Sequence, residues 1–389
     1  MKKETLILIV ILFIMARCGV GDNQSDDFIT VDVTKNYPKK ELILQDFMDV
    51  EYIPLEMNDD FLCQGFVQAV GKDIILIRNF IRDGNLFIFD RKTGKGLKKI
   101  NRRGQGGEEY TNIDAIILDE DKGEMFVNDI GARRILVYDL DGNYKRSFKH
   151  KEGAMYNRIY NFDHENLICY DGFIGNDGMA SEQSFMTISK QDGIITHEID
   201  ISFKEKISTA LIVQKGDMTW GANPSNHYPI VPYMNNFVLI DSSSDTIYSY
   251  SQNHTMKPLI VRTPPVGTME PEVFLFPNIL TDRYYFMRTV KKEYDFETNS
   301  GFPSTDLAYD KYEKKIFRCT IYNDDFTNKE QVVLPWMPMN KEIATWHLSQ
   351  APQLIESYER GILKGRLKEI VAELDEESNP VIMLIKHKK

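Results

Sequence analysis

Residues 103–148 decide the fold, and they read RGQGGEEYTNIDAIILDEDKGEMFVNDIGARRILVYDLDGNYKRSF. Four short apolar segments begin in this stretch, at positions 113, 124, 134 and 144, and the turns DEDKG, DIGAR and DLDG separate them. Short apolar segments bounded by turns that contain Asp and Gly are typical of strands in antiparallel hairpins. The stretch therefore predicts one four-stranded antiparallel sheet.

The third strand of that sheet, with the polar turn after it, recurs along the chain. The segments NLFIFD, RILVYD, FMTIS and FVLID end at Asp90, Asp139, Ser189 and Asp241, which are 49, 50 and 52 residues apart. A fifth copy, at 316–322, comes later, before the turn NDDF. A period near 50 residues, made of short strands, is the pattern of a β-propeller, in which each repeat forms one blade.

The two ends of the chain supply a sixth blade in this interpretation. The segments VEYIPLE at 50–56 and PVIMLIK at 380–386 are strand-like, and we expect them to pair, because pairing removes the exposed sheet edges. One amphipathic helix is expected at about 353–374, weakened by Gly361 and Gly365; a partner-binding or coiled-coil helix is the alternative. Residues 28–389 are thus predicted to form one all-β, six-bladed β-propeller with terminal-strand closure and a C-terminal amphipathic helix.

The N-terminal residues are typical of an export signal. Lys2 and Lys3 precede an apolar run of ten residues, 6–15, which is shorter than the about 20 residues that span a bilayer. We therefore expect a signal peptide at 1–17, and a polar, acidic tether at 18–27 that begins with Cys18.

Composition excludes several classes of protein. The net charge is 47 − 58 = −11, so no nucleic-acid partner is expected, because there is no basic excess to meet phosphates. After Cys18 the remaining cysteines, Cys63, Cys169 and Cys319, are far apart in apolar segments, which predicts small buried side chains and neither a disulfide framework nor a zinc cluster.

These patterns resemble two families. Gly104, Gly106 and Tyr110, with the turn from Asp139 to Gly142, resemble an NHL-type propeller repeat. With VEYIPLE, NDDF and NPVIMLIK added, the chain from about residue 28 resembles the six-bladed β-propeller lipoproteins of Bacteroidetes.

The N-terminus extends the resemblance. The segment up to Cys18 resembles a bacterial lipobox, although Arg17 replaces the usual small residue, and Ser25-Asp26-Asp27 resembles the acidic surface-export signal of such lipoproteins. The resemblance implies lipidation of Cys18, a lipid bilayer as a partner, and an outer-membrane lipoprotein that faces the surface or the periplasm.

Loop lengths locate the expected site. In a four-stranded blade, the loops from the second to the third strand and from the fourth strand to the next blade emerge at one end, and here these are the long ones. We expect a concave pocket at that mouth of the channel. The candidate ligand-binding residues there are Arg78, Arg102, Arg103, Asp129, Arg133, Asp171, Trp220, His227, Tyr228 and Arg288, with Arg78, Asp129, Asp171, Trp220 and Arg288 at the ends of second strands. Arginine with tryptophan suits an anionic or sugar-like ligand.

Three functions remain open from the sequence. The favoured one is a membrane-anchored binding protein without chemistry or cofactor, whose partners would be a saccharide, a peptide or an envelope protein, because no catalytic motif and no metal-ligand spacing of histidines occurs. The second is a metal-assisted hydrolase or lyase similar to lactonase-type propellers, with a divalent ion in the channel held by Asp129, Asp171 and His227. The third is a purely structural module of an envelope complex.

Overall fold

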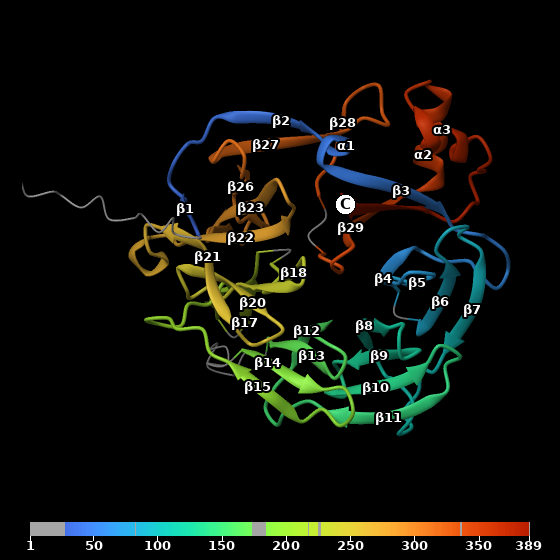
Figure 1. The fold of residues 1–389 in the computed structure, drawn as a ribbon, viewed down its shortest axis with the longest axis horizontal. Coiled ribbons are helices and arrows are strands. Elements are labelled where there is room, and N and C mark those ends of the chain that lie inside the picture. The colour runs from blue at the N-terminus through green and yellow to red at the C-terminus, as the bar shows by residue number, and fades with distance from the viewer. Residues whose placement is uncertain are drawn as a thin grey trace, which may run out of the picture.

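The computed structural model is a ring of six β-sheets around a central channel (Figure 1). It describes residues 28–81, 83–172, 184–216, 218–224, 227–334 and 337–388. The predicted signal peptide, Cys18 and the tether lie outside these residues. No helix of the described segments is long and apolar enough to cross a membrane.

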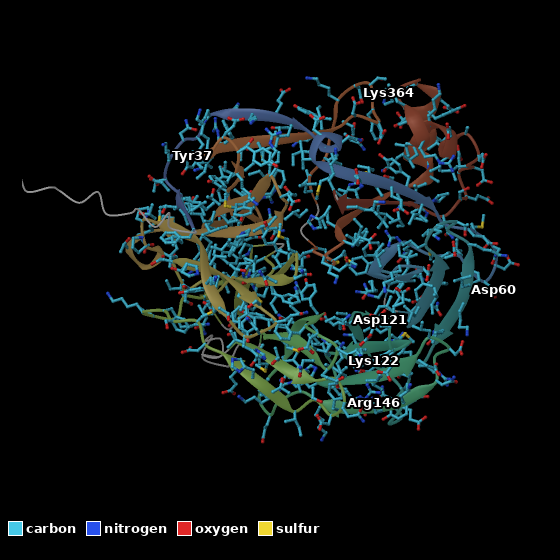
Figure 2. All side chains as sticks on the ribbon, in the orientation of Figure 1. Tyr37, Asp60, Asp121, Lys122, Arg146 and Lys364 are labelled. Carbon is cyan, nitrogen blue, oxygen red and sulfur yellow. The ribbon has the colours of Figure 1, made fainter. Side chains whose placement is uncertain are left out.

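The first three blades are four-stranded antiparallel sheets, as predicted. Their strands, given from the channel outward, are β4 (Phe66–Val70), β5 (Ile74–Arg78), β6 (Asn85–Asp90) and β7 (Gly96–Asn101); β8 (Ile113–Asp119), β9 (Glu124–Asp129), β10 (Arg134–Asp139) and β11 (Tyr144–Lys149); β12 (Tyr156–Asn161), β13 (Asn166–Asp171), β14 (Phe185–Ser189) and β15 (Ile195–Ile199). Figure 2 shows this radial order in the second blade, where Asp121 and Lys122 lie on the inner turn and Arg146 on the outer strand.

The fourth and fifth blades each gain a strand from the N-terminal segment. Their own strands are β18 (Ile230–Tyr233), β19 (Asn236–Leu239), β20 (Thr246–Ser251) and β21 (Met256–Thr263); β22 (Val273–Leu280), β23 (Tyr284–Lys291), β26 (Ser304–Asp310) and β27 (Lys315–Asn323). β1 (Ile29–Asp32) pairs in parallel with β21, and β2 (Lys39–Ile43) with β27. These two additions were not predicted, and they cover the outer edges of both sheets.

The sixth blade confirms the predicted closure of the ring. β29 (Ile343–Ser349) pairs with β30 (Val381–His387), which pairs with the N-terminal β3 (Met48–Pro54). Residues 337–342 line the channel on the inner side of β29, in the position that an innermost strand would take. The Asn340 side chain fixes its end by donating a hydrogen bond to the Val70 carbonyl (2.9 Å) of the first blade.

The prediction of one continuous helix at about 353–374 is wrong. Two short helices, α2 (Ala351–Glu359) and α3 (Gly365–Val371), replace it. Gly361, after α2, and Gly365, the first residue of α3, have φ of 69° and 56°, a left-handed conformation that an α-helix cannot continue through. Both helices pack by their apolar sides around Leu354, Leu363 and Leu367.

In the fourth blade the predicted strand order is wrong, because the prediction placed Trp220 at the end of the blade's second strand. The hairpin of β16 (Leu211–Lys215) and β17 (Met218–Ala222) is a separate two-stranded sheet, not the inner half of this blade. Asp241 therefore follows the second strand, β19, whereas Asp90 and Asp139 end third strands. The remaining short elements are α1 (Leu44–Phe47), the 3-10 turn Val266–Thr268, the hairpin β24 (Tyr294–Asp295) with β25 (Ser300–Gly301), and β28 (Glu330–Gln331).

Neighbouring blades are held together by shared apolar cores and by one recurring glycine. One core joins the second and third blades through Val137, Ile159 and their neighbours, and an equivalent core fills each of the other gaps in the ring. Gly142, in the turn between a third and a fourth strand, has φ of 81°, and an added Cβ would lie 2.9 Å from Ile100 of the preceding blade. Gly193 faces Phe148 in the same way. The glycine allows the turn of one blade to touch the outer strand of the blade before it.

The two ends of the channel differ as the sequence predicts. Connections at one end, from the first to the second and from the third to the fourth strand, have two to five residues in the first five blades. We call this end the short-turn face. Connections at the other end, the long-loop face, have four to 31 residues and include the β16–β17 hairpin and, by the direction of β29 and β30, both α2 and α3.

Candidate ligand site

A cavity of about 530 Å³ occupies the channel. Its walls come from β4, β8 and β12, the innermost strands of three blades, from Tyr228 and Pro232 of the fourth, and from 337–342 of the sixth. The other lining residues lie in turns of the short-turn face, among them Lys72, Asp121, His164 and Asn235. The cavity therefore opens at the short-turn face.

Aromatic and guanidinium groups stack on one another at the opposite end of the cavity. The Arg158 guanidinium carbon lies 4.8 Å from the centre of the Tyr228 ring, and that of Arg78 lies 4.5 Å from the centre of the Phe66 ring. Phe66 also contacts Phe80 and Trp346, with ring centres 4.8 and 5.6 Å away. Phe66, Arg158 and Tyr228 line the cavity, so these stacks form part of its wall at this end.

Charges at the mouth of the cavity are paired with each other. Lys72 Nζ lies 3.0 Å from Asp121, and this hydrogen bond lowers the pKa of Asp121. The buried Lys190 ammonium donates to Asp119 (2.7 Å) and to the Asp163 carbonyl (2.8 Å). The lining of the mouth nevertheless keeps a net charge of 3 − 5 = −2, because Asp119, Glu120, Asp121, Asp163 and Glu342 stand against Lys72, Lys190 and Lys341.

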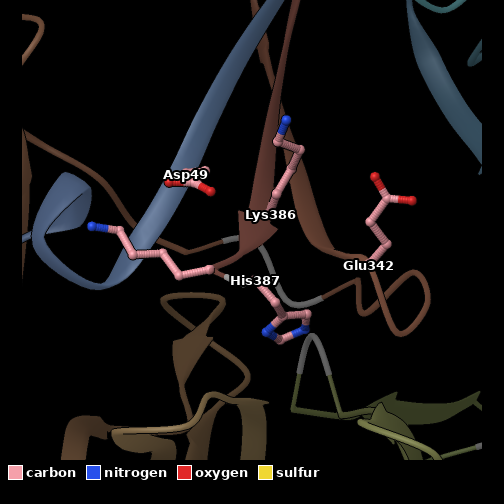
Figure 3. A pocket seen from close by; sticks show the side chains of 5 residues that line it. Asp49, Glu342, Lys386 and His387 are labelled. Atoms are coloured by element: carbon pink, nitrogen blue, oxygen red, sulfur yellow. The ribbon is translucent and has the colours of Figure 1, made fainter.

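A second, shallower hollow adjoins the mouth beside the sixth blade (Figure 3). It has a volume of about 360 Å³ and is lined by Asp49, Glu342, Lys386, His387 and Lys388. Glu342 lines both hollows and forms an ion pair with Arg91 (3.0 Å). Acidic and basic groups are balanced here, so the hollow selects for neither charge.

At the long-loop face, where the sequence predicts the pocket, a small hollow contains Arg78 and Arg103. Its volume is about 10 Å³, which is too small for an organic ligand. The predicted position of the ligand pocket therefore differs from the position of the 530 Å³ cavity, which opens at the opposite face.

Asp129 and Asp171 do lie at the ends of second strands, as predicted, and each fastens a loop. The buried Asp129 carboxylate accepts hydrogen bonds from the Thr111 hydroxyl (2.7 Å) and backbone N–H (2.8 Å), and from two further N–H groups, of Asn112 and Ala132. Asp171 accepts one from the Met155 N–H (2.9 Å). Both carboxylates thereby attach the loop entering a blade to that blade's second strand.

The predicted arginines do not gather around the channel cavity: Arg78 and Arg103 line the small hollow, and none of them lines the cavity. Arg102 and Arg103 are both exposed, and Arg102 Nε donates a hydrogen bond to the Gly142 carbonyl (3.0 Å) that joins the first two blades. Arg133 is exposed in the turn after β9, with φ of 48°. Arg288 lies inside β23, not at its end, and forms a bidentate pair with Asp306 (2.6 and 2.9 Å).

The remaining predicted residues are divided between three places. Trp220 is 46% exposed in the β16–β17 hairpin, opposite Val213, and is not at the end of a blade's second strand. His227 is half-buried with its ring centre 4.3 Å from that of Phe276, and desolvation of the ring lowers its pKa to about 4. Tyr228 lines the channel cavity, and it is the one predicted ligand-binding residue that does so.

Sequence reasoning missed Arg158, the cationic residue at the inner end of the cavity. The prediction searched the ends of second strands, whereas the channel is lined by first strands. In the β12 segment YNRIYN, a period of two places Arg158 and Tyr160 on the same face, and this pattern could have identified them. The described residues contain no group of three or more His, Cys, Asp or Glu side chains that could hold a metal ion.

Comparison with solved structures supports the fold. A protein from Bacteroides fragilis NCTC 9343, whose name assigns it to the exported proteins, is similar with a TM-score of 0.61 and 15% sequence identity, over 90% of this chain and 99% of that one. A member of the DUF4221 family from Bacteroides vulgatus is 10% identical over 88% of this chain and 98% of that one, with a TM-score of 0.45. A search of curated proteins gave no match. Residues 28–386 match the model described as "Domain of unknown function (DUF4934)", and the chain therefore belongs to the DUF4934 family.

Proposed function

We propose that this protein is an exported, lipid-anchored propeller of the cell envelope that binds a small ligand in its channel and performs no chemistry on it. The observation that carries the proposal is the 530 Å³ cavity, whose volume falls within the range of about 300–1,000 Å³ for small-molecule sites. Its walls belong to inner strands of several blades, so binding would need little rearrangement.

Mass spectrometry of extracts from the natively purified protein tests the proposal. We expect a small molecule at near-stoichiometric amount in the wild type. Gln68→Trp should deplete it, because Gln68 lines the cavity and its side chain makes only one long hydrogen bond, of 3.5 Å, to the Val67 carbonyl. Trp220→Ala, at the long-loop face, is the matched control and should leave the amount unchanged. Equal amounts in wild type and Gln68→Trp, with both folded, would place the ligand elsewhere.

The membrane anchor needs its own test. The proposal rests on Cys18 after an apolar run of ten residues. In the native host, labelled palmitate should enter the wild type and not Cys18→Ser, and the variant should move from the membrane to the soluble fraction. Membrane association that survives Cys18→Ser without label would show an uncleaved anchor instead.

A partner protein at the long-loop face is the second candidate. The exposed apolar side chains of the β16–β17 hairpin favour it, since Ile212, Met218 and Trp220 are 55%, 62% and 46% exposed. Crosslinking in native membranes would support this candidate if a partner is captured by the wild type and lost in Trp220→Ala.

A further inference from the structure

The inner end of the channel cavity contains a cation whose hydrogen-bonding capacity is only partly used. Arg158 Nη1 donates one hydrogen bond, to the Asn157 carbonyl (2.6 Å). Its Nε is buried without a partner, and the guanidinium forms no ion pair with any described residue. An arginine normally directs its N–H donors at a carboxylate or a carbonyl.

A polar atom without a partner lies next to it. Asn157 lines the same cavity, and its Oδ1 is buried with no hydrogen-bond partner. Buried polar atoms that lack partners are rare in folded proteins, because each loses its hydration without compensation. The described residues contain nine such atoms, five of them arginine Nε, and what distinguishes Asn157 and Arg158 is that both residues line the channel cavity. This shared position indicates groups that a ligand completes.

The charge at this end of the cavity limits the class of ligand. At the mouth, Lys72 and Lys190 are already paired with acidic groups, whereas Arg158 is not. One guanidinium matches a single negative charge, and its fork suits the two oxygens of a carboxylate. Asp114, the second residue of β8, also lines the cavity and adds a carboxylate near its inner end, so a phosphate dianion would leave negative charge uncompensated there.

The walls require an apolar body as well. The Tyr228 ring lies under the guanidinium, and the cavity is also lined by Ile159, Met337 and Met339. The Tyr160 hydroxyl donates a hydrogen bond to the Pro338 carbonyl (3.2 Å) and so holds this wall in place across the channel.

We propose that the channel binds a small organic monocarboxylate with an apolar body, whose carboxylate pairs with Arg158 while a neighbouring hydroxyl or amine donates to Asn157. This inference rests on the proposed function, because it specifies the chemistry of the ligand in the same cavity. Arg158 selects the anion, and the aromatic and methionine walls hold the apolar body.

Two fluorescent probes that differ in one group test the inference: 1-pyrenebutyrate and the neutral 1-pyrenebutanol. Fluorescence titration should give wild-type protein at least about tenfold tighter binding of the acid, since a hydrogen bond to a charged group contributes about that factor. Arg158→Gln should bind both probes with the affinity of wild type for the alcohol. Arg158→Lys should keep part of the preference. Lys341→Gln, a charge change at the mouth, should keep all of it.

The outcomes separate the two levels of the argument. Equal binding of both probes by the wild type, blocked by Gln68→Trp, would retain the cavity as a binding site and overturn the selection for anions. A preference for the acid that persists in Arg158→Gln would overturn the role of Arg158. Binding of neither probe by folded protein would overturn both this inference and the proposed channel site. Circular dichroism and the melting temperature establish that each variant is folded.

Discussion

Replacing Asp129 by alanine should strongly destabilise the second blade. The carboxylate is fully buried and accepts four hydrogen bonds, three of them from backbone N–H groups that would be left without an acceptor. Leaving a buried donor unsatisfied costs about 1–3 kcal/mol, and breaking a buried network seldom costs more than about 5 kcal/mol because such terms are not additive. We therefore expect a loss of about 4 kcal/mol in the free energy of unfolding.

Differential scanning calorimetry gives the measurement. With an unfolding entropy of about 2.1 cal/mol/K per residue over roughly 360 residues, about 4 kcal/mol corresponds to a fall in melting temperature of about 5 °C. Asp121→Ala is the matched control, because that carboxylate is exposed and pairs only with the exposed Lys72; its melting temperature should change by less than about 1 °C. A decrease in melting temperature of less than about 1 °C for Asp129→Ala would refute the view that this carboxylate fastens the loop.

Two further predictions concern packing and pH. Gly193→Ala should lower the free energy of unfolding by about 2–3 kcal/mol, because it adds a clash with Phe148 to the strain of a φ of 74°. Gly123→Ala, at a φ of 63° with open space around it, should cost only about 1 kcal/mol. Equal losses for the two variants in urea unfolding would contradict the contact between blades. Burial, the largest cause, lowers the pKa of His150 to about 4, so the unfolded chain binds more protons than the folded one between about pH 6.5 and 4. Stability should therefore fall as the pH drops through this window, by up to about 3 kcal/mol from this group, and His150→Gln should flatten the pH profile of the melting temperature; an unchanged slope would count against it.

Much of the fold could be predicted because its signals are local. In the second blade, each predicted turn lies where the structure has it, since Asp and Gly in DEDKG and DLDG set the backbone through contacts within a few residues. The closing strands could also be predicted, because a propeller with unpaired ends would expose sheet edges. The error in the fourth blade arose where a separate hairpin imitates two blade strands, which periodicity alone cannot distinguish.

By itself, then, the chain's order of residues determined the strands and turns of the first three blades, the number of blades and the unequal lengths of the connections. Only the tertiary structure decided where the channel cavity lies, because its wall brings together residues such as Arg158 and Tyr228, which are 70 positions apart in the chain. It likewise decided that β1 and β2 add to blades four and five. The physical reason is that turn chemistry acts between near neighbours, whereas a channel wall is assembled from one strand of each blade, and no local pattern records which side chains meet there.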